Sequence, residues 1–390
     1  MLIKAKSKLL SLYIHWPYCE SKCPYCDFNS HVNEAFDPKQ WIKCYTNQLL
    51  EMKEQLLNHN VNFNSLNAIF FGGGTPSLMP LEIIDSILRT ASNLFGFAEN
   101  VEISLEANPS SYEKDKFYDL KEIGINRLSI GVQSLNDANL KLLGRLHNTE
   151  DAQVAVEHAN KTFNNISVDL IYAFHGQKII DWTNELKIFL RKNNLQHISL
   201  YQLTVEEGTK FFTNYKKGLF NIIDDDKAAD FYEVSNEILN DQNFIKYEIS
   251  NHAKHGFKCK HNLNYWNSQN WMGIGPGAYG RLWSSKSNNR VEYQNYKNPR
   301  TWLSKNIYKS EFEKTNFFND ATSDIDTLTM GLRLSEGIET SKLYDESIIK
   351  SDAFKKLEEE KIIIIKDGVL KVSENNMIKL NSIIDLLINS

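Results

Sequence analysis

The sequence predicts an α/β fold with a parallel β-sheet, followed by a small α+β domain at the C-terminus. Six β-rich runs recur between residues 11 and 204, and amphipathic helical segments separate them. Strands that alternate with helices form parallel βαβ units, whose right-handed crossovers lead to an open doubly wound sheet or to a barrel. In both architectures ligands bind at the carboxyl ends of the strands, so a site is expected there.

The six expected strands span residues 11–16, 67–75, 101–107, 126–134, 165–174 and 197–204. The first expected helix begins at Asp37, a good capping residue, and at Pro38, which suits the first helical turn. This helix would bury one face, formed by Trp41, Tyr45, Leu49, Met52 and Leu56. Further helices are expected at 81–95 and 184–193.

The alternation stops near residue 205, which predicts a change of architecture. An acid-capped helix at 224–242 leads to an aromatic and glycine-rich region at 247–280, and a loop-rich stretch surrounds residues 284–290. After that we expect a helix at 324–334, a hairpin that turns at Asp367 and Gly368, and a final helix. The chain is therefore divided into a core barrel at 1–240, an aromatic and glycine-rich segment at 241–305, and a small winged-helix-like domain at 306–390.

The composition excludes several classes of partner. The 44 basic and 49 acidic residues give a net charge of -5 without a concentrated basic stretch, which argues against binding to nucleic acid. Residues 351–373 of the winged-helix-like part hold five lysines, five acids and no arginine, unlike a DNA-binding domain. No apolar run approaches the length of a membrane span, and the N-terminus lacks the apolar core of a signal peptide. A cytoplasmic protein is expected.

Three of the five cysteines, Cys19, Cys23 and Cys26, follow the first expected strand as a C-x3-C-x2-C run. An odd number of cysteines with three clustered is not typical of a disulfide framework and suits a reducing compartment. No fourth ligand stands at zinc-ribbon spacing, although His15 or His31 could complete a structural zinc site. The run also suits an iron–sulfur cluster in which one iron stays open to the amino and carboxylate groups of S-adenosylmethionine (SAM).

The other two cysteines are expected to have different roles. Cys44 lies on the apolar face of the first expected helix and is interpreted as a core residue. Cys259 lies in a histidine-rich region, where both a structural position and a position near a ligand stay open.

A series of sequence blocks resembles the radical SAM superfamily, in its branch of oxygen-independent coproporphyrinogen III oxidase-like proteins. The blocks occur in order over most of the chain: LYIHWPYCESKCPYCDF, FFGGGTPS, LEANP, IGVQS, LGRLHN and VDLIYA. The resemblance implies an incomplete (β/α)6 TIM-like barrel with a [4Fe-4S] cluster at its mouth. SAM would be an exchangeable ligand of that cluster.

By matched position, the resemblance implies that Cys19, Cys23 and Cys26 hold the cluster. The SAM pocket would contain Tyr13, Tyr25, Gly73, Gly74, Thr75, Glu106, Gln133, Arg145 and Asp169. Glycine allows the backbone to approach a ligand closely. An arginine suits a carboxylate, and the acids suit ribose hydroxyls or an ammonium group.

The branch contains an enzyme and a carrier, and three observations favour the carrier. Phe28 stands where the decarboxylating oxidase has another cysteine, and the chain reaches its first strand by residue 11, without the N-terminal segment of the oxidase. The run HNLNYW at 261–266 resembles the signature of the heme chaperones of this branch, although Tyr279 replaces a more usual histidine. A heme chaperone that passes heme to a respiratory or other hemoprotein is therefore expected, with coproporphyrinogen III oxidase as the alternative.

The resemblance implies that His261 contacts heme, since histidine is a common axial ligand and a neighbouring Tyr and Trp could pack on the macrocycle. His252 and His255 could compete as ligands, and a histidine in an aromatic region is otherwise a core residue. A peripheral membrane contact and a homodimer are further expectations.

One motif is interpreted as a decoy. Gly275, Gly277 and Gly280 match G-x-G-x-x-G, but no clean strand is expected before them and no amphipathic helix after them. A tight turn is expected there instead of a dinucleotide site.

Overall fold

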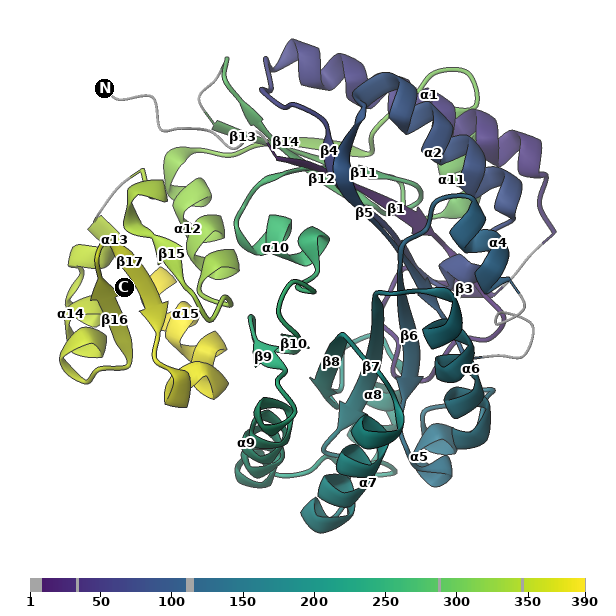
Figure 1. Cartoon of the computed structure of the whole chain (residues 1–390). Coiled ribbons are helices and arrows are strands. Elements are labelled where there is room, and N and C mark those ends of the chain that lie inside the picture. The colour runs from purple at the N-terminus through teal and green to yellow at the C-terminus, as the bar shows by residue number, and fades with distance from the viewer. Residues whose placement is uncertain (1–8, 33–34, 110–115, 287–288, 345–346, 390) are drawn as a thin grey trace.

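The computed structural model describes residues 9–32, 35–109, 116–286, 289–344 and 347–389. A curved twelve-stranded sheet dominates it, with helices along the convex side (Figure 1). Its parallel strands are, in spatial order, β11 (Asn270–Ile274), β1 (Leu10–Trp16), β4 (Leu66–Gly73), β5 (Phe97–Ala107), β6 (Arg127–Gln133), β7 (Ile166–Tyr172) and β8 (His197–Gln202).

Antiparallel strands extend the sheet at both ends. Beyond β11 lie β12 (Tyr279–Ser284), β13 (Asn289–Gln294) and β14 (Lys314–Phe317), and beyond β8 lie β10 (Asn251–Ala253) and β9 (Ile245–Lys246). Within the described residues β14 and β9 do not pair with each other, so the barrel stays open. The predicted incomplete α/β barrel is confirmed.

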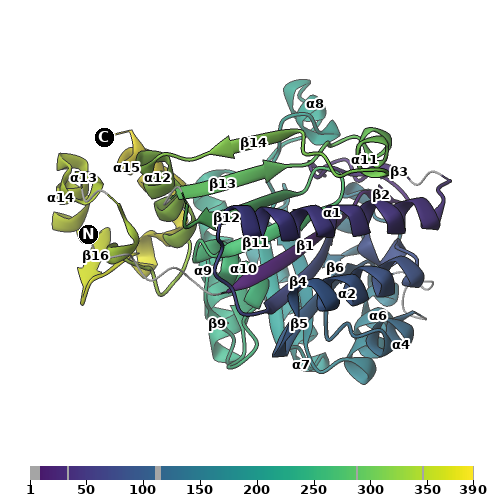
Figure 2. The same ribbon diagram turned by 90° about the horizontal axis from the view of Figure 1, so that it is seen from above.

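The helices connect successive strands. They are α1 (Pro38–Asn58), α2 (Leu81–Phe95), α4 (Phe117–Glu122), α5 (Asp137–Leu142), α6 (Thr149–Thr162), α7 (Ile179–Lys192), α8 (Lys210–Lys216), α9 (Asp225–Asp241), α10 (Lys260–Trp266) and α11 (Pro299–Asn306). Figure 2 shows α1 beside α2 along the outer face of the sheet. The predicted start of α1 is confirmed, because the Asp37 side chain accepts a hydrogen bond from the Lys39 N–H.

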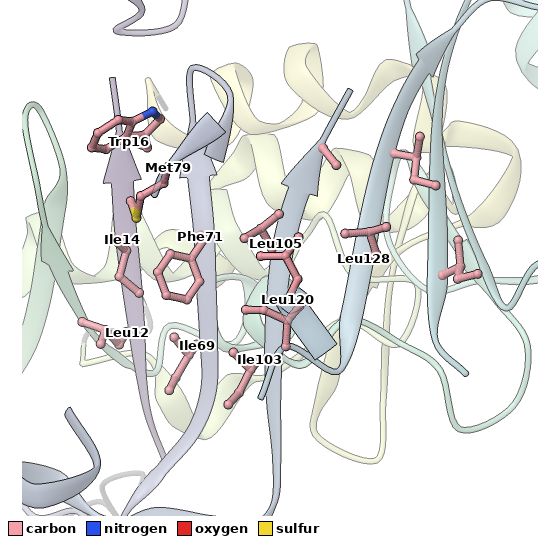
Figure 3. Close-up of a cluster of buried hydrophobic side chains, with 14 of the residues drawn as sticks. Leu12, Ile14, Trp16, Ile69, Phe71, Met79, Ile103, Leu105, Leu120 and Leu128 are labelled. Atoms are coloured by element: carbon pink, nitrogen blue, oxygen red, sulfur yellow. The ribbon is translucent and has the colours of Figure 1, made fainter. Parts of the chain in front are cut away.

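Alternation along each strand separates an apolar outer face from a more polar inner face. On the outer face, Leu12 is paired with Ile69 and Ile14 with Phe71, and the ladder continues to Ile103 and Leu105 on β5 (Figure 3). These residues are buried in one large cluster together with the apolar faces of α1 and α2. The residues between them, such as Tyr13, Ser104 and Glu106, point into the barrel. Helix α10 contacts β1, β4 and β11, on this inner side.

The C-terminal part has a core of its own. It contains α12 (Asp320–Gly331), α13 (Ser347–Lys350), α14 (Asp352–Glu359), α15 (Leu380–Ile388) and a three-stranded sheet of β15 (Ile338–Glu339), β17 (Val369–Val372) and β16 (Ile363–Lys366). The predicted hairpin turn at Asp367 and Gly368 is confirmed, and both residues have positive φ. An ionic cluster joins this part to the barrel sheet, since Asp326 of α12 pairs with Arg281 and Arg290.

Two expectations differ from the structure. Within the loop-rich stretch expected around 284–290, Ser285 and Lys286 form a turn as expected, but Ser284 ends β12, and Asn289 and Arg290 begin β13. Strand β11 directly precedes Gly275, where no clean strand was expected. These strands are held by pairing with each other and with β1, a long-range effect that overrides weak local signals. The motif is still not a dinucleotide site, because its third glycine, Gly280, lies in strand β12 where a dinucleotide site would have a helix. The division at residues 240 and 305 stays a prediction.

No described helix is both long enough and apolar enough to cross a membrane.

Phe71 tests the outer core. It is fully buried in β4, so Phe71→Ala should lower the free energy of unfolding by about 3–5 kcal/mol through lost burial and the cavity left behind. The control is Leu57→Ala on α1, where the side chain is 66% exposed and the change should be small. Urea denaturation followed by tryptophan fluorescence measures both, and equal losses would contradict the assignment of this core.

Candidate functional site

A cavity of about 340 Å³ opens at the carboxyl ends of the parallel strands. The loop after β1 forms one wall, and the ends of β4, β5, β6, β7 and β8 form the others. Eleven of the predicted site residues line it: Cys19, Cys23, Tyr25, Cys26, Gly73, Gly74, Thr75, Glu106, Gln133, Arg145 and Asp169. The parallel strands therefore bring together side chains that are up to 150 positions apart in the sequence, counting from Cys19 to Asp169 (169 − 19).

The cysteine loop begins at β2 (Tyr18–Cys19), which pairs with β3 (His31–Val32). The Cys26 N–H donates to the Cys23 carbonyl at 3.2 Å, which closes a turn between these two cysteines. All three thiols are half-buried, and none of them forms a disulfide bond. Burial raises the pKa of Cys19 to about 11, so its thiolate needs a positive partner at neutral pH.

Glycines at the end of β4 let it approach the cysteine loop. A Cβ on Gly74 would lie 3.0 Å from the Cys19 Sγ and 2.9 Å from the Tyr18 carbonyl oxygen. The Gly74 N–H donates to the Trp16 carbonyl at 2.7 Å, and the Thr75 N–H donates to the Tyr18 carbonyl at 2.9 Å. The glycine run thus positions the loop itself, in addition to the contact with SAM that the resemblance implies.

Arg145 brings a positive charge to the cavity. Its Nη1 lies 3.6 Å from the Cys23 Sγ, and its Nη2 donates to the Gly131 carbonyl at 3.1 Å and to the Asn108 side chain. Its Nε is buried and has no hydrogen-bond partner among the described residues. An arginine that lines the cavity beside a thiol and keeps one buried donor unpaired fits a site for an anionic group.

Two carboxyl groups lie deeper in the cavity. Burial, and then repulsion from Asp169, raise the pKa of Glu106 to about 8, and its Oε2 accepts from the Gly73 N–H at 3.3 Å. Burial also raises the pKa of Asp169, whose carboxylate accepts from the Ser129 hydroxyl at 3.1 Å. A bound cation would favour the ionised form of both groups.

Two predicted residues do not line the cavity. His261 is 2% exposed on the inner side of the barrel, with its ring stacked 4.9 Å from Phe70 and 6.0 Å from Tyr13, between ring centroids. Neither ring nitrogen of His261 has a hydrogen-bond partner among the described residues. The Tyr13 hydroxyl is hydrogen-bonded to the His15 Nδ1 at 3.0 Å, and its ring packs against Phe70 and His261.

The chain is similar to known proteins in both sequence and fold. Residues 13–187 match the model of the radical SAM superfamily. A relative from Haemophilus influenzae, named heme chaperone HemW, is 38% identical over 75% of this chain and 76% of its own. The bovine protein named radical S-adenosyl methionine domain-containing protein 1, mitochondrial, is 36% identical over 71% of this chain and 61% of its own.

This chain belongs to the radical SAM superfamily. Among solved structures, the coproporphyrinogen III oxidase HemN from Escherichia coli superposes with a TM-score of 0.79 at 16% identity, covering 99% of this chain and 92% of that one. At that identity the likeness shows the radical SAM fold alone.

Membership of the superfamily implies a [4Fe-4S] cluster and SAM, and the donor set fits both. No three His, Cys, Asp or Glu side chains in the described residues converge on a single ion position. A cubane cluster does not require that, because each cysteine binds a different iron atom. Cationic iron would also stabilise the thiolates of Cys19 and Cys26, whose pKa values burial raises.

The remaining candidates are occupied by structural contacts. His15 uses both ring nitrogens, on the Tyr13 hydroxyl and the Asn29 carbonyl, which leaves none for zinc. Cys44 is fully buried, which confirms its core position. Cys259 is also fully buried, and its thiol lies 3.5 Å from the Glu102 carboxylate.

His252 is buried and bonded to Asn236, whereas His255 is exposed.

Sequence reasoning missed Asn108 and Tyr201, which also line the cavity. Asn108 bonds to Arg145 and donates to the Thr75 hydroxyl at 3.2 Å, so it orders two predicted residues at once. The sequence could have indicated Asn108, because this polar residue follows Glu106 by two positions at the end of an expected strand. Tyr201 carried no comparable signal.

Cluster assembly tests the three cysteines. After anaerobic reconstitution with iron and sulfide, Cys19→Ala, Cys23→Ala and Cys26→Ala should each lose most of the bound iron, because one iron of the cubane loses its protein ligand. Cys44→Ala is the control and should keep the wild-type content. Iron analysis and visible absorbance report the result, and a Cys23→Ala chain that retains the cluster would contradict the site.

Glu106 gives the cluster-free protein a defined pH dependence. Its pKa is raised from 4.5 to about 8 on folding, so between these values the folded state binds more protons than the unfolded state, and stability falls as pH rises. Glu106→Gln should remove this loss, so the variant gains stability relative to wild type toward pH 8. Urea denaturation across this window measures it, with the exposed Glu157→Gln as the matched control. Parallel profiles of wild type and Glu106→Gln would contradict the assignment.

Proposed function

We propose that this radical SAM protein binds heme and transfers it to an acceptor hemoprotein, with a [4Fe-4S] cluster and SAM in the cavity. The observation that carries the proposal is the 38% identity to a relative named heme chaperone HemW over three quarters of both chains. The H-N-x-x-Y-W run adds support, because it forms nearly all of α10.

His261 is the proposed heme contact. A buried imidazole with two unsatisfied nitrogens costs about 1–3 kcal/mol for each group, so it calls for a reason to persist. Burial lowers the pKa of His261 to about 3, which keeps the ring neutral, the form that binds iron. A role as a ligand for heme iron would explain why the two ring nitrogens of His261 are left unpaired.

Heme cannot reach this ring while α10 occupies the barrel, since the side chain is 2% exposed. Heme binding at His261 therefore requires α10 to turn away from β1 and β4. The polar contacts that such a movement would break lie at the start and the middle of α10. The Glu102 carboxylate accepts from the Lys260 N–H at 2.9 Å and from the His261 N–H at 3.5 Å, and the Lys260 ammonium donates to the Asn100 carbonyl at 2.5 Å. Asn264 is hydrogen-bonded to Asn67 at 3.0 Å. A seven-residue helix between two loops suits such a displacement.

In the cavity, Cys19, Cys23 and Cys26 would hold the cluster, which when bound supplies an electron for cleavage of SAM. Arg145 would orient the carboxylate of SAM, and Glu106 and Asp169 would accept from its ammonium or ribose groups. Gly73, Gly74 and Thr75 would line its methionine end, with Gln133 and Tyr25 completing the pocket.

The setting of the proposed function is carried over from the expectations based on the sequence. We place the protein in the cytoplasm, with a respiratory or other hemoprotein as acceptor, a peripheral membrane contact and a homodimeric assembly. The oxidase alternative is supported only by the shared fold. Phe28, where the oxidase has another cysteine, is 59% exposed at the cavity rim.

Anaerobic heme titration tests the proposal. The wild-type chain should develop a Soret band that saturates at a fixed ratio of heme to protein, and His261→Ala should reduce the affinity at least about tenfold, the loss of one good ligand contact. His252→Ala and His255→Ala are the matched variants and should bind as wild type does. A parallel assay measures decarboxylation of coproporphyrinogen III.

The possible outcomes test the proposed function and the proposed heme ligand separately. Absence of saturable heme binding, with decarboxylation present, would replace the chaperone with the oxidase. If His252→Ala or His255→Ala abolishes the Soret band and His261→Ala does not, the chaperone function stands and His261 is rejected as the heme ligand.

A further inference from the structure

Asn29 lies three residues after Cys26 and joins the cysteine loop to two distant parts of the chain. Its Nδ2 donates to the Pro276 carbonyl at 3.0 Å and to the Lys297 carbonyl at 2.9 Å. These acceptors lie after β11 and before α11. One amide thus bridges the loop to both ends of the β12–β13 hairpin, and an aspartate of the same shape would place a carboxylate against two carbonyl oxygens.

The glycine turn after β11 is shaped to receive this side chain. Gly277 has a φ of +76°, and a Cβ there would lie 2.6 Å from the Asn29 Nδ2. Gly275 has a φ of +97°, and a Cβ there would collide with the His15 carbonyl oxygen. Gly275 is therefore needed for the close approach to β1, and Gly277 for the close approach to the cysteine loop.

His15 holds the backbone of Asn29 from the other side. The Asn29 carbonyl can only accept, so the His15 Nε2, at 2.9 Å, carries the hydrogen. In the neutral ring Nδ1 then accepts from the Tyr13 hydroxyl at 3.0 Å. Asn29 is thereby fixed through its side chain by residues 276 and 297, and through its backbone by β1.

We propose that Asn29, seated in the turn at Gly275–Gly277, is a positioning residue for the cluster. It would set where the cysteine loop lies relative to the sheet, and hence where the open iron faces SAM. The inference rests on the proposed cluster and goes beyond the proposed function, because Asn29, Pro276, Gly277 and Lys297 do not line the cavity. Outer partners of metal ligands typically affect metal affinity by 10–100-fold when they are replaced.

The test follows cluster loss in the full chain. After anaerobic reconstitution, an iron chelator is added and the fall in cluster absorbance is timed. Asn29→Asp and Gly277→Ala should each lose the cluster about tenfold faster than wild type. The same variants should also show a weaker SAM-induced change in the EPR spectrum of the reduced cluster, a signature that a general loss of stability does not produce.

Two control variants show whether an effect comes from the place of Asn29 and Gly277 in the fold or from the loss of any asparagine or glycine. Asn193→Ala removes a buried amide that donates to the Phe189 carbonyl, remote from the loop. Gly218→Ala imposes the same backbone strain as Gly277→Ala, since Gly218 has a φ of +68°, but a Cβ there has nothing within 4 Å. Both controls should lose the cluster at the wild-type rate.

A double-mutant cycle keeps the proposal falsifiable if Asn29→Asp does not fold. The added Cβ of Gly277→Ala meets chiefly the Asn29 amide, so in an Asn29→Ala background it should cause little further acceleration. Fully additive effects of the two substitutions would overturn the role of Asn29 and leave the proposed cluster untouched. Wild-type rates of cluster loss and wild-type EPR changes in folded variants would do the same. A wild-type chain that assembles no cluster would overturn the proposed cluster, and this inference with it.

Discussion

The close approach of the cysteine loop to the end of β4 is the contact on which the rest of the site depends. Two backbone hydrogen bonds, from Gly74 to Trp16 and from Thr75 to Tyr18, hold the loop at the carboxyl edge of the sheet. A side chain at Gly74 would push against the Cys19 sulfur. Because the loop is fixed there, the thiols face the polar strand ends that follow, and the cavity forms between them.

The same two-residue period that builds the core also supplies the chemistry of the cavity. On β5, Ile103 and Leu105 pack outward against helices, so Ser104 and Glu106 must point inward. On β7, Asp169 lies between the outward residues Val168 and Leu170. A buried carboxyl in such an interior is poorly solvated, which explains the raised pKa of Glu106 and makes the site receptive to a cationic ligand.

The sequence was sufficient for features that local pattern determines. The alternating strands follow from periodicity, and the start of α1 at Asp37 follows from its capping residue. The site residues Glu106, Arg145 and Asp169 were implied by the family resemblance and not by any local pattern. The strands β12 and β13, the burial of His261 and the bonds of Asn29 depend on partners far along the chain, up to 268 positions for Lys297. A local pattern carries no signal for such contacts, so a histidine in a heme-like motif could not be distinguished from a core residue.

Tyr13 connects the two halves of the proposed function. Its ring stacks on His261 of α10, and its hydroxyl donates to His15, which in turn holds the backbone of Asn29 in the cysteine loop. The turn that receives the Asn29 side chain directly follows β11, and residues 267–269 alone separate β11 from α10. Movement of α10 away from the barrel would therefore uncover Tyr13 and pull on the strand next to the cluster loop. Helix α10, which carries the proposed heme contact, and the loop of the three cysteines are thus linked through Tyr13 and His15, so displacement of α10 would disturb a contact of the residues that hold the loop.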